Sequence, residues 1–358
     1  MTRPRVLAAM SGGVDSSVAA ALLVEGGFET IGVTMKLLSR AETGFGCCGS
    51  PADVDDAKRV CEKLGIPHYT ADMAEMFESK VIKPYVDAYL GGLTPNPCVE
   101  CNRSVKFGHL LGLADAWGCA TVATGHYARV EDGRLLKSLD RAKDQTYFLY
   151  ALTQKELAKA AFPVGGLSKE AVRAKARELG LKTADKPESM ETCFVPGRDV
   201  RGFVAARPEA EGAPALTRGP IRSTDGRLLG EHAGLASYTV GQRRGLGVTA
   251  PEPTYVVRLE PETNTLVVGG EGETGVSALL AGRVTWTRGV PNGPRRAEVR
   301  VRHRHVPAPA TLEVRADGAV AVSFDAPQRA PAPGQAAVFY DGDEVLGGGT
   351  ILRGGSHE

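Results

Sequence analysis

A short polar segment near the start of the chain has the composition of a phosphate-binding turn. Residues 11–17 are Ser-Gly-Gly-Val-Asp-Ser-Ser, and they lie between two apolar runs, 6–9 and 18–23. The first run predicts a buried strand and the second predicts a helix. A strand that turns directly into a helix leaves backbone N–H groups unpaired at the helix N-terminus, where the helix dipole also attracts anions. Gly12 and Gly13 let the main chain approach a phosphate closely, and the serine hydroxyls add donors.

This segment lacks the lysine that follows the last glycine of a Walker A loop, so we do not expect it to hold a γ-phosphate for transfer. Its sequence and its place at the first strand–helix turn resemble the PP-loop of the N-type ATP pyrophosphatases. The resemblance implies that ATP is cleaved between its α- and β-phosphates and that a substrate oxygen is activated as its adenylate. The alternative is an ordinary glycine-rich turn.

Two cysteines, Cys98 and Cys101, occur in a proline-stiffened stretch at 94–102, Thr-Pro-Asn-Pro-Cys-Val-Glu-Cys-Asn. We expect Asn102 to cap the helix that follows, which would place Cys101 near a helix N-terminus. Such a position lowers the pKa of a thiol and favours its nucleophilic thiolate form. Packed loop cysteines and a zinc site are the alternatives, although a structural zinc site would need a second pair of cysteines at matching spacing.

A third stretch, 191–197, is Glu-Thr-Cys-Phe-Val-Pro-Gly and contains Cys193. A single cysteine beside an apolar pair is by itself more often a packing residue than a reactive one. Its presence in the same chain as an ATP-type loop favours a chemical role for Cys193.

The first half of the chain predicts a framework that brings these groups together. Strand patterns at 6–9, 30–35, 66–69 and 120–124 alternate with helical patterns, which indicates an α/β fold with a doubly wound parallel sheet covered on both faces. Ligands bind such sheets at the carboxyl ends of the strands, so we expect the Ser11 loop to meet Gly125-His126 there. The helical patterns are 53–64 with Asp53 as cap and Gly65 as end, 73–90 with a break at Pro84, 103–117, and 167–181 with Ser168 as cap.

Helical periodicity fades after about residue 200, where short strand patterns between glycine and asparagine turns replace it, as at Pro291-Asn292-Gly293. We therefore expect three parts. They are a PP-loop ATP pyrophosphatase-type catalytic domain at 1–200, a small middle domain at 201–275 and a C-terminal β-barrel-like domain at 276–358.

The composition is that of an ordinary globular protein of 358 residues with a formal net charge of +1. We find no apolar run long enough to span a bilayer and no signal-peptide pattern, so we expect a cytoplasmic protein without a membrane partner. The seven cysteines, an odd number, are expected to be reduced thiols. The Gly-x-Gly-x-x-Gly pattern at 44–49 does not directly follow a strand, so we interpret it as a loop, in which Cys47 and Cys48 have no assigned role.

Six motifs resemble those of the tRNA-specific 2-thiouridylase family, in that family's order and over nearly the whole chain. They are Ser-Gly-Gly-Val-Asp-Ser-Ser at 11–17, Asn-Pro-x-x-x-Cys-Asn at 96–102, Ala-Thr-Gly-His-Tyr at 123–127, Lys-Asp-Gln at 143–145, Cys-Phe-Val at 193–195 and Tyr-Thr-Val-Gly-Gln-Arg-Arg-Gly-Leu-Gly at 238–247.

This resemblance implies a reaction in which ATP adenylates the C2 oxygen of the wobble uridine of a tRNA and releases pyrophosphate. Sulfur carried as a persulfide then replaces that oxygen, AMP leaves and 2-thiouridine remains. In the family, Cys193 corresponds to the persulfide carrier and Cys101 to the partner nucleophile, which can end in a disulfide with it. The resemblance also implies Mg²⁺ and a sulfur donor protein, such as a cysteine desulfurase or a relay protein.

Binding residues follow from the same resemblance. Those that match the ATP site are Ala9, Met10, Ser11, Gly12, Gly13, Val14, Asp15, Ser16, Met35 and Gly125, with Asp15 helping to hold Mg²⁺. Those that match the target-base segment are Asn96, Pro97 and Cys98, and those that match tRNA contacts are His126, Lys143, Asp144, Gln145 and Gln335. Seven arginines against one glutamate at 281–305 would neutralise tRNA phosphates, with a solvated β-surface as the alternative.

Cys98 departs from a common family pattern, in which many members have Asp at this position. If Cys98, Cys101 and Cys193 converge, three thiolates could hold a [4Fe–4S] cluster and leave one iron open for a sulfide. A cluster ligand is not available to carry sulfur, so this scheme competes with the persulfide role of Cys193. Both schemes stay open at this point.

Two further functions compete with thiolation. A nitrogen-transferring PP-loop synthetase would share residues 11–17 but would not need Cys101 or Cys193. An RNA-binding or iron–sulfur scaffold protein with a vestigial loop would not need the full set of serines together with Asp15.

Overall fold

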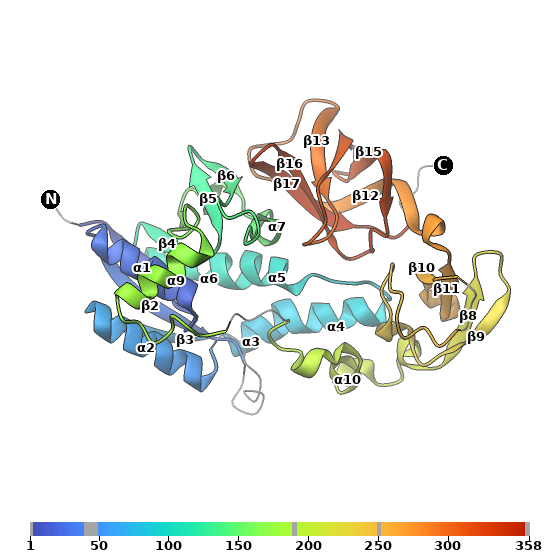
Figure 1. Ribbon diagram of the computed structural model, residues 1–358, viewed down its shortest axis with the longest axis horizontal. Helices are drawn as coiled ribbons and strands as arrows, with labels where there is room; N and C mark the ends of the chain where they lie inside the picture. The colour runs from blue at the N-terminus through green and yellow to red at the C-terminus, as the bar shows by residue number, and fades with distance from the viewer. Residues whose placement is uncertain (1–2, 39–48, 188–191, 249–251, 355–358) are drawn as a thin grey trace. The chain divides into compact units, whose positions relative to one another are not determined.

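The computed structural model describes residues 3–38, 49–187, 192–248 and 252–354 (Figure 1). Two compact units are present, and each is described by itself. The first comprises Met1–Val81, Cys98–Pro196 and Asp343–Leu346, and the second comprises Ile82–Pro97, Gly197–Gly342 and Gly347–Glu358. The glycine-rich pattern at 44–49, with Cys47 and Cys48, falls almost entirely outside the described residues. In the described part of the chain, no helix is both long enough and apolar enough to cross a bilayer.

The first unit is built on the expected parallel sheet, whose strand order is β3-β2-β1-β4-β7. The strands are β1 (Arg5–Ala9), β2 (Glu29–Lys36), β3 (His68–Asp72), β4 (Thr121–Ala123) and β7 (Ala160–Ala161). The chain moves outward from β1 to β2 and β3, then returns to the other side of β1 at β4. The order therefore reverses between β1 and β4, which is the position where open α/β sheets bind ligands.

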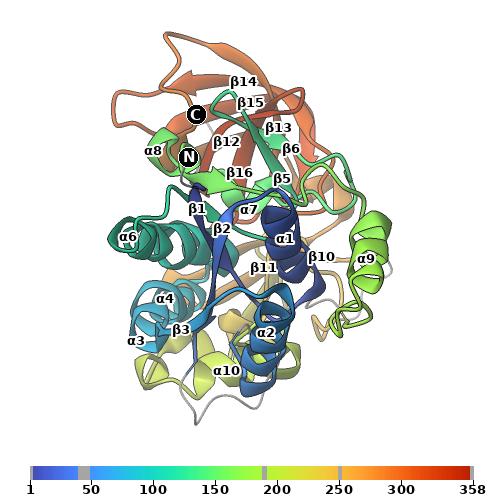
Figure 2. The same cartoon turned by 90° about the vertical axis from the view of Figure 1, so that its left-hand side faces the viewer.

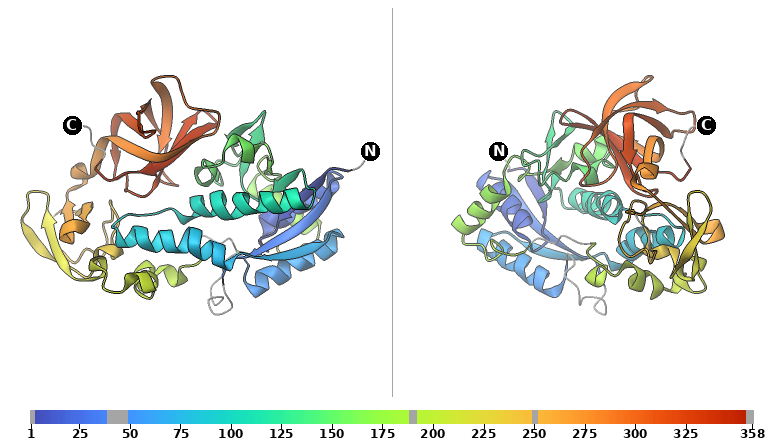
Figure 3. Two further views of the ribbon diagram at one scale, coloured as in Figure 1. Left: turned by 180° about the vertical axis from the view of Figure 1, so that it is seen from behind. Right: turned by 45° about the vertical axis from the view of Figure 1, so that its right-hand side comes forward.

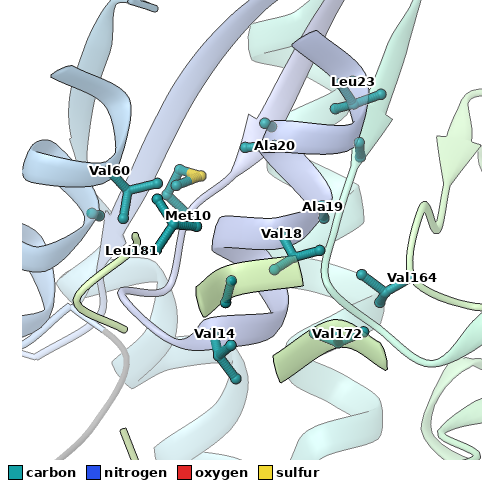
Figure 4. Close-up of a cluster of buried hydrophobic side chains, with 14 of the residues drawn as sticks. Met10, Val14, Val18, Ala19, Ala20, Leu23, Val60, Val164, Val172 and Leu181 are labelled. Atoms are coloured by element: carbon teal, nitrogen blue, oxygen red, sulfur yellow. The ribbon is translucent and has the colours of Figure 1, made fainter. Parts of the chain in front are cut away.

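Helices cover both faces of this sheet, as the doubly wound prediction requires. Figure 2 shows α1 (Val14–Glu25) and α6 (Gly108–Ala116) on opposite sides of β1. Buried side chains of β1 and α1 pack with those of α2 (Pro51–Leu64) and α9 (Lys169–Glu178), among them Val18, Val60 and Val172 (Figure 4). Because α1 is buried on most of its surface, the turn that precedes it is held in place by core packing.

Two helix boundaries test the capping predictions. Ser168 caps α9 as expected, since its side chain accepts a hydrogen bond from the Ala171 N–H. The prediction for α2 was wrong: its cap is Ser50, whose Oγ accepts from the Asp53 N–H, while Asp53 lies in the first turn. The proline at the first helical position, Pro51, fits that earlier start, and the helix ends at left-handed Gly65 as predicted.

The helix that carries Cys98 and Cys101 also begins earlier than expected. It runs without a gap through α5 (Pro97–Glu100), a π-helical segment (Cys101–Phe107) and α6. Asn102 is therefore not a cap: it lies inside the helix, where its side-chain amide donates to the Phe148 carbonyl oxygen at 3.0 Å. A similar π-helical segment, Glu78–Ile82, joins α3 (Ala74–Phe77) to α4 (Lys83–Leu90), at the break predicted near Pro84.

The first unit also contains a hairpin formed by β5 (Ala128–Glu131) and β6 (Arg134–Lys137). Two short helices, α7 (Thr146–Leu149) and α8 (Gln154–Leu157), follow it. Residues 343–346 join this hairpin from the far end of the sequence. Glu344 lies opposite Leu136, and the Asp343 carboxylate accepts hydrogen bonds from Arg129 and Arg141.

The second unit is mainly β-structure, as the loss of helical periodicity predicted. After α10 (Val200–Ala205), four strands form a sheet in the order β10-β11-β8-β9, around a core that includes Ile221, Val256 and Leu266. These strands are β8 (Gly219–Ser223), β9 (Leu228–His232), β10 (Tyr255–Glu260) and β11 (Thr265–Gly269).

Six further strands close into a barrel (Figure 3) in the order β12-β15-β14-β13-β16-β17, with β17 pairing back to β12. They are β12 (Gly275–Trp286), β13 (Arg295–Arg300), β14 (Ala308–Val314), β15 (Val320–Arg329), β16 (Ala336–Asp341) and β17 (Glu344–Ile351). Closure leaves no unpaired edge strand. The expected fold class, a parallel α/β part followed by a small middle part and a barrel, is confirmed.

Candidate active site

A cavity of about 170 Å³ lies at the carboxyl ends of β1, β2 and β4, at the reversal of strand order. It brings together residues from five separate parts of the sequence. The lining residues are Ala9, Met10, Ser11, Asp15, Ser16, Met35, Lys106, Thr124, Gly125, His126 and Gln145. Seven of the ten residues predicted for the ATP site are among them, and so are His126 and Gln145, which the resemblance assigned to tRNA.

The loop at 11–17 holds its shape through its own serines. The hydroxyls of Ser11 and Ser16 lie 2.9 Å apart, and the Ser11 N–H donates to the Ser16 hydroxyl. Ser17 donates to the carbonyl oxygen of Gly13, which is the extended N-cap of α1 and provides no side-chain cap. The first N–H groups of α1 therefore face the loop without a capping side chain, which is the arrangement that binds phosphate at a helix N-terminus.

Two glycines are required here by close main-chain contacts. Gly12 has a φ of +71°, and a Cβ at this position would lie 2.4 Å from the Asp53 carbonyl oxygen. A Cβ on Gly125 would lie 2.5 Å from the Ser16 nitrogen. Because backbone atoms cannot move aside as a flexible side chain can, a side chain at either position would distort the loop.

Asp15 is joined by two residues that sequence reasoning missed. The Lys169 ammonium donates to both Asp15 carboxylate oxygens, at 2.7 and 2.8 Å, and the Tyr127 hydroxyl donates to the same carboxylate at 2.9 Å. Lys169 is buried and is the first residue of α9. The sequence predicted that helix and its cap, but it gave no sign that Lys169 contacts a residue 154 positions earlier.

A second lysine, Lys186, bonds to the loop but is not among the residues that line the cavity. Lys186 donates to the Gly12 carbonyl oxygen at 3.0 Å and to the carboxylates of Asp53 and Asp56, both at 2.7 Å. Burial alone would lower the pKa of Lys186, but its hydrogen bonds to the two carboxylates outweigh burial, so its pKa is raised. Lys186 therefore remains charged and ties the loop to the first turn of α2.

His126 is neutral in this site. Burial, with a contribution from the nearby charge of Lys106, lowers its pKa well below the usual value of 6.5. The Lys106 ammonium lies 3.4 Å from His126 Nε2, and Thr124 Oγ1 lies 2.7 Å from His126 Nδ1. Since an ammonium only donates, Nε2 is the acceptor and the ring proton is on Nδ1, facing Thr124.

In the segment Lys143–Gln145, the side chains of Asp144 and Gln145 form hydrogen bonds with other residues of the first unit. The buried Asp144 carboxylate accepts from the Ser138 N–H and the Thr146 hydroxyl. Gln145 accepts from the Tyr127 N–H, and Lys143 is half-buried. The tRNA contacts assigned to these residues stay predictions, and the Asp144 side chain already serves to organise its own loop.

The three cysteines of interest differ in exposure. Cys98 is exposed in the first turn of α5, Cys101 is buried one turn later, and Cys193 is half-buried. The surrounding protein atoms desolvate Cys98 and, with an added contribution from Cys193, raise its pKa to about 11, while Lys106 opposes the shift. No three His, Cys, Asp or Glu side chains in the described ranges lie close enough together to hold a metal ion. The cluster on Cys98, Cys101 and Cys193 therefore stays a prediction.

The turn that carries Cys193 is anchored by its apolar neighbours. Phe194 and Val195 are both buried, and the Phe194 ring packs edge-on against Phe77 with centroids 5.6 Å apart. The Val195 N–H donates to the Thr192 carbonyl oxygen at 3.0 Å. The apolar pair in the sequence therefore serves packing, and it holds the neighbouring thiol near the surface.

Asn96, Pro97 and Gln335 belong to the second unit and are not among the residues that line the loop cavity. Gln335 donates to the Thr94 carbonyl oxygen at 2.9 Å and fixes the start of the cysteine-bearing stretch. It also borders a cavity of about 570 Å³, together with Gln242 and Arg302. Of the arginines at 281–305 that were predicted to neutralise tRNA phosphates, Arg295 pairs with Asp341 and Arg296 pairs with Asp325.

Comparisons with known proteins match the chain in three successive parts. A family model described as the tRNA methyl transferase HUP domain matches residues 4–197. One described as the tRNA methyl transferase PRC-barrel domain matches 212–270, and one described as the aminomethyltransferase beta-barrel domain matches 276–351.

Curated relatives align over almost the whole length. The tRNA-specific 2-thiouridylase MnmA of Symbiobacterium thermophilum is 49% identical over 366 residues, which cover 98% of this chain and 92% of the relative. The protein of the same name from Solibacter usitatus is 47% identical over 372 residues, with 98% of this chain and all of the relative covered. That of Heliobacterium modesticaldum is 46% identical over 97% of this chain and 92% of the relative.

Proposed function

This chain belongs to the tRNA-specific 2-thiouridylase family, and from that premise we propose how its own residues carry out the reaction. It is a tRNA sulfurtransferase that forms 2-thiouridine in an ATP-dependent reaction. We propose that the modified base is the wobble uridine and that ATP binds in the cavity at the Ser11 loop. We assign the sulfur transfer to Cys101 and Cys193.

In the first step, the uridine C2 oxygen attacks the α-phosphorus of ATP and pyrophosphate leaves. The bare N-terminus of α1 and the serines of the loop suit the pyrophosphate oxygens. Lys169, held against Asp15, suits the charge that develops on pyrophosphate as it departs. Mg²⁺ commonly binds through one or two carboxylates plus phosphate oxygens, so Asp15 fits a role as its protein ligand, and bound Mg²⁺ would neutralise charge on the pyrophosphate.

In the second step, the terminal sulfur of a persulfide on Cys193 attacks C2, a C–S bond forms, and AMP leaves with the former C2 oxygen. The Cys101 thiolate then attacks the Cys193 sulfur, which breaks the S–S bond to the transferred sulfur. The products are 2-thiouridine and a Cys101–Cys193 disulfide, and a dithiol reductant must reduce that disulfide before the next turnover. A sulfur donor protein must reload Cys193.

One observation carries this assignment. A single continuous helix, Pro97–Ala116, presents Cys98 and Cys101 near its start and Lys106, which lines the loop cavity, about one turn later. A nitrogen-transferring synthetase would have no use for thiols so close to its nucleotide. We also propose a cytoplasmic location, because ATP and tRNA occur together there.

The test uses protein purified without oxygen, whose iron and sulfide contents are measured first. Unmodified tRNA is then incubated with ATP and either a persulfide donor protein or inorganic sulfide, and 2-thiouridine is measured by mass spectrometry of nucleosides. We expect activity with the persulfide donor and no dependence on iron. Activity that tracks about four irons per chain would replace the persulfide scheme with a [4Fe–4S] cluster on Cys98, Cys101 and Cys193. Pyrophosphate release without any 2-thiouridine would overturn the assignment.

A further inference from the structure

We propose that Lys106 is a catalytic residue, which binds the α-phosphate of ATP and then of the adenylated uridine, and which stabilises AMP as sulfur displaces it. The inference deepens the proposed function and rests on it. Neither the sequence motifs nor the comparisons assign a role to this lysine.

Lys106 is placed to touch the nucleotide. Among the described residues that line the loop cavity, it is the one side chain with a positive charge, since His126 is neutral. The two other lysines near the loop, Lys169 and Lys186, bond to the carboxylates of Asp15, Asp53 and Asp56 and are not among the residues that line the cavity. An anionic ligand in this cavity therefore meets Lys106 directly.

The lysine is also oriented. Its ammonium lies 3.4 Å from His126 Nε2, and the opposite ring nitrogen is fixed by Thr124, which directly follows β4. A neutral imidazole can accept from the ammonium without cancelling its charge. His126 thus acts as a positioning residue, which directs the charge of Lys106 into the cavity.

The backbone places this charge beside the sulfur chemistry as well. Cys101 and Lys106 are the first and sixth residues of the π-helical segment, in which each turn spans more residues than in an α-helix. Residues five apart therefore lie on nearly the same face. Lys106 also acts electrostatically on Cys98, where it favours the thiolate. One cation thus faces both the nucleotide cavity and the thiol end of the helix.

The α-phosphate takes part in both chemical steps, as the group attacked in adenylation and as part of the leaving group in sulfur transfer. In adenylation, the uridine O2–Pα bond forms and the Pα–O bond to the β-phosphate breaks. In sulfur transfer, the C2–S bond forms, the C2–O bond breaks, and AMP leaves with that oxygen and its electron pair. A fixed cation at the α-phosphate lowers the barrier of both steps, and the loss of one such group typically costs about 10²- to 10³-fold in rate.

The experiment compares Lys106→Met and Lys106→Arg with Lys159→Met, which removes the same charge from an exposed pair with Asp115. Single-turnover pyrophosphate release and 2-thiouridine formation are measured with saturating ATP and tRNA, and ATP affinity is measured by calorimetry. Alkylation of Cys98 at pH 8.5 is followed by peptide mass spectrometry as a readout that does not depend on turnover.

For Lys106→Met we expect both rates to fall by about 10²-fold or more, with less than about tenfold loss of ATP affinity. Alkylation of Cys98 should slow by about three- to tenfold, because its thiolate is less favoured. Lys106→Arg should recover part of both rates, and Lys159→Met should match the wild type. Rates within about threefold of the wild type in Lys106→Met would overturn the proposal. Absence of 2-thiouridine with the wild-type protein would instead overturn the proposed function.

Discussion

The loop at 11–17 and the turn that carries Cys193 belong to the same catalytic proposal, but they are held in opposite ways. The loop is fixed by main-chain contacts: glycines with no room for a Cβ, a buried helix behind it, and lysines that bond to its carbonyl and carboxylate oxygens. The Cys193 turn is anchored by two apolar side chains, Phe194 and Val195, and its thiol is half-buried.

This difference fits the two tasks. A phosphate site works through dipoles and N–H groups whose positions must not change, so rigid backbone packing is an advantage there. A thiol that receives sulfur from one protein and delivers it to a base needs access from solvent. We therefore expect damage to the loop to appear as lost ATP binding, and damage to the turn to appear as lost sulfur transfer with ATP binding intact.

The largest expected effect is that of Cys193→Ala. We expect 2-thiouridine formation to fall by more than about 10³-fold, since no other group takes over a missing nucleophile. ATP affinity, measured by calorimetry, should stay within about twofold, because Cys193 does not line the cavity. Cys119→Ala is the matched control and should remain active. A large loss of ATP binding in Cys193→Ala would mean that the turn and the loop are not independent.

A somewhat smaller effect is expected from Gly125→Ala. Its Cβ would meet the main chain of Asp15 and Ser16, so we expect ATP affinity to fall by about 10²-fold. Gly166→Ala is the control, since a Cβ there meets nothing within 4 Å. Both are tested by ATP titration and by thermal unfolding. Equal ATP affinity in the two variants would contradict the main-chain account of the loop.

Lys169→Met should have an intermediate effect on activity and a clear effect on stability. It leaves Asp15 with Tyr127 as a partner but without its cation, and we expect a loss of about 2 kcal/mol in the free energy of unfolding, with pyrophosphate release lowered by about 10- to 100-fold. The double variant Asp15→Asn/Lys169→Met should regain stability without regaining activity, as measured by urea unfolding. Lys175→Met removes a partly exposed ion pair between the same helix and Glu25, and it should change stability by less than about 0.5 kcal/mol. If the double variant is no more stable than Lys169→Met, the ion pair is not the source of the loss.

The smallest effect concerns pH. Folding lowers the pKa of His126, so the unfolded chain binds a proton below about pH 6.5 that the folded protein does not. The contribution of His126 to stability is therefore present above that pH and is lost as the pH falls. Between pH 7.5 and 5.5 the wild type should lose about 1 kcal/mol more than His126→Asn does. Parallel curves would show that folded His126 takes up the proton as readily as the unfolded chain does. Other histidines with lowered pKa, such as His68, affect both proteins alike.

These results also show which parts of the site were predictable. The parallel sheet and the loop could be predicted because apolar runs and glycines act locally. The contacts of Lys169, Lys186 and Tyr127 could not be predicted, because each of these residues bonds to the 11–17 loop from more than a hundred residues away in the sequence. A lysine at the start of a helix, such as Lys169, is also common and does not by itself indicate a partner. Asn102 misled the prediction because it resembles a cap, whereas Pro97 already provides the first helical position.

The contribution of residues 343–346 to the first unit affects how the protein is made. Asp343 pairs with Arg129 across 214 residues of sequence, and β17 then continues into the barrel, where it closes against β12. During synthesis the β5–β6 hairpin leaves the ribosome long before this strand exists. Contacts of such long range form slowly, because the intervening chain must first be ordered. Neither the hairpin nor the barrel can therefore complete its strand pairing until β17 has been synthesised. A ribosome that stalls before β17 leaves both with an unpaired strand edge, which chaperones must then protect.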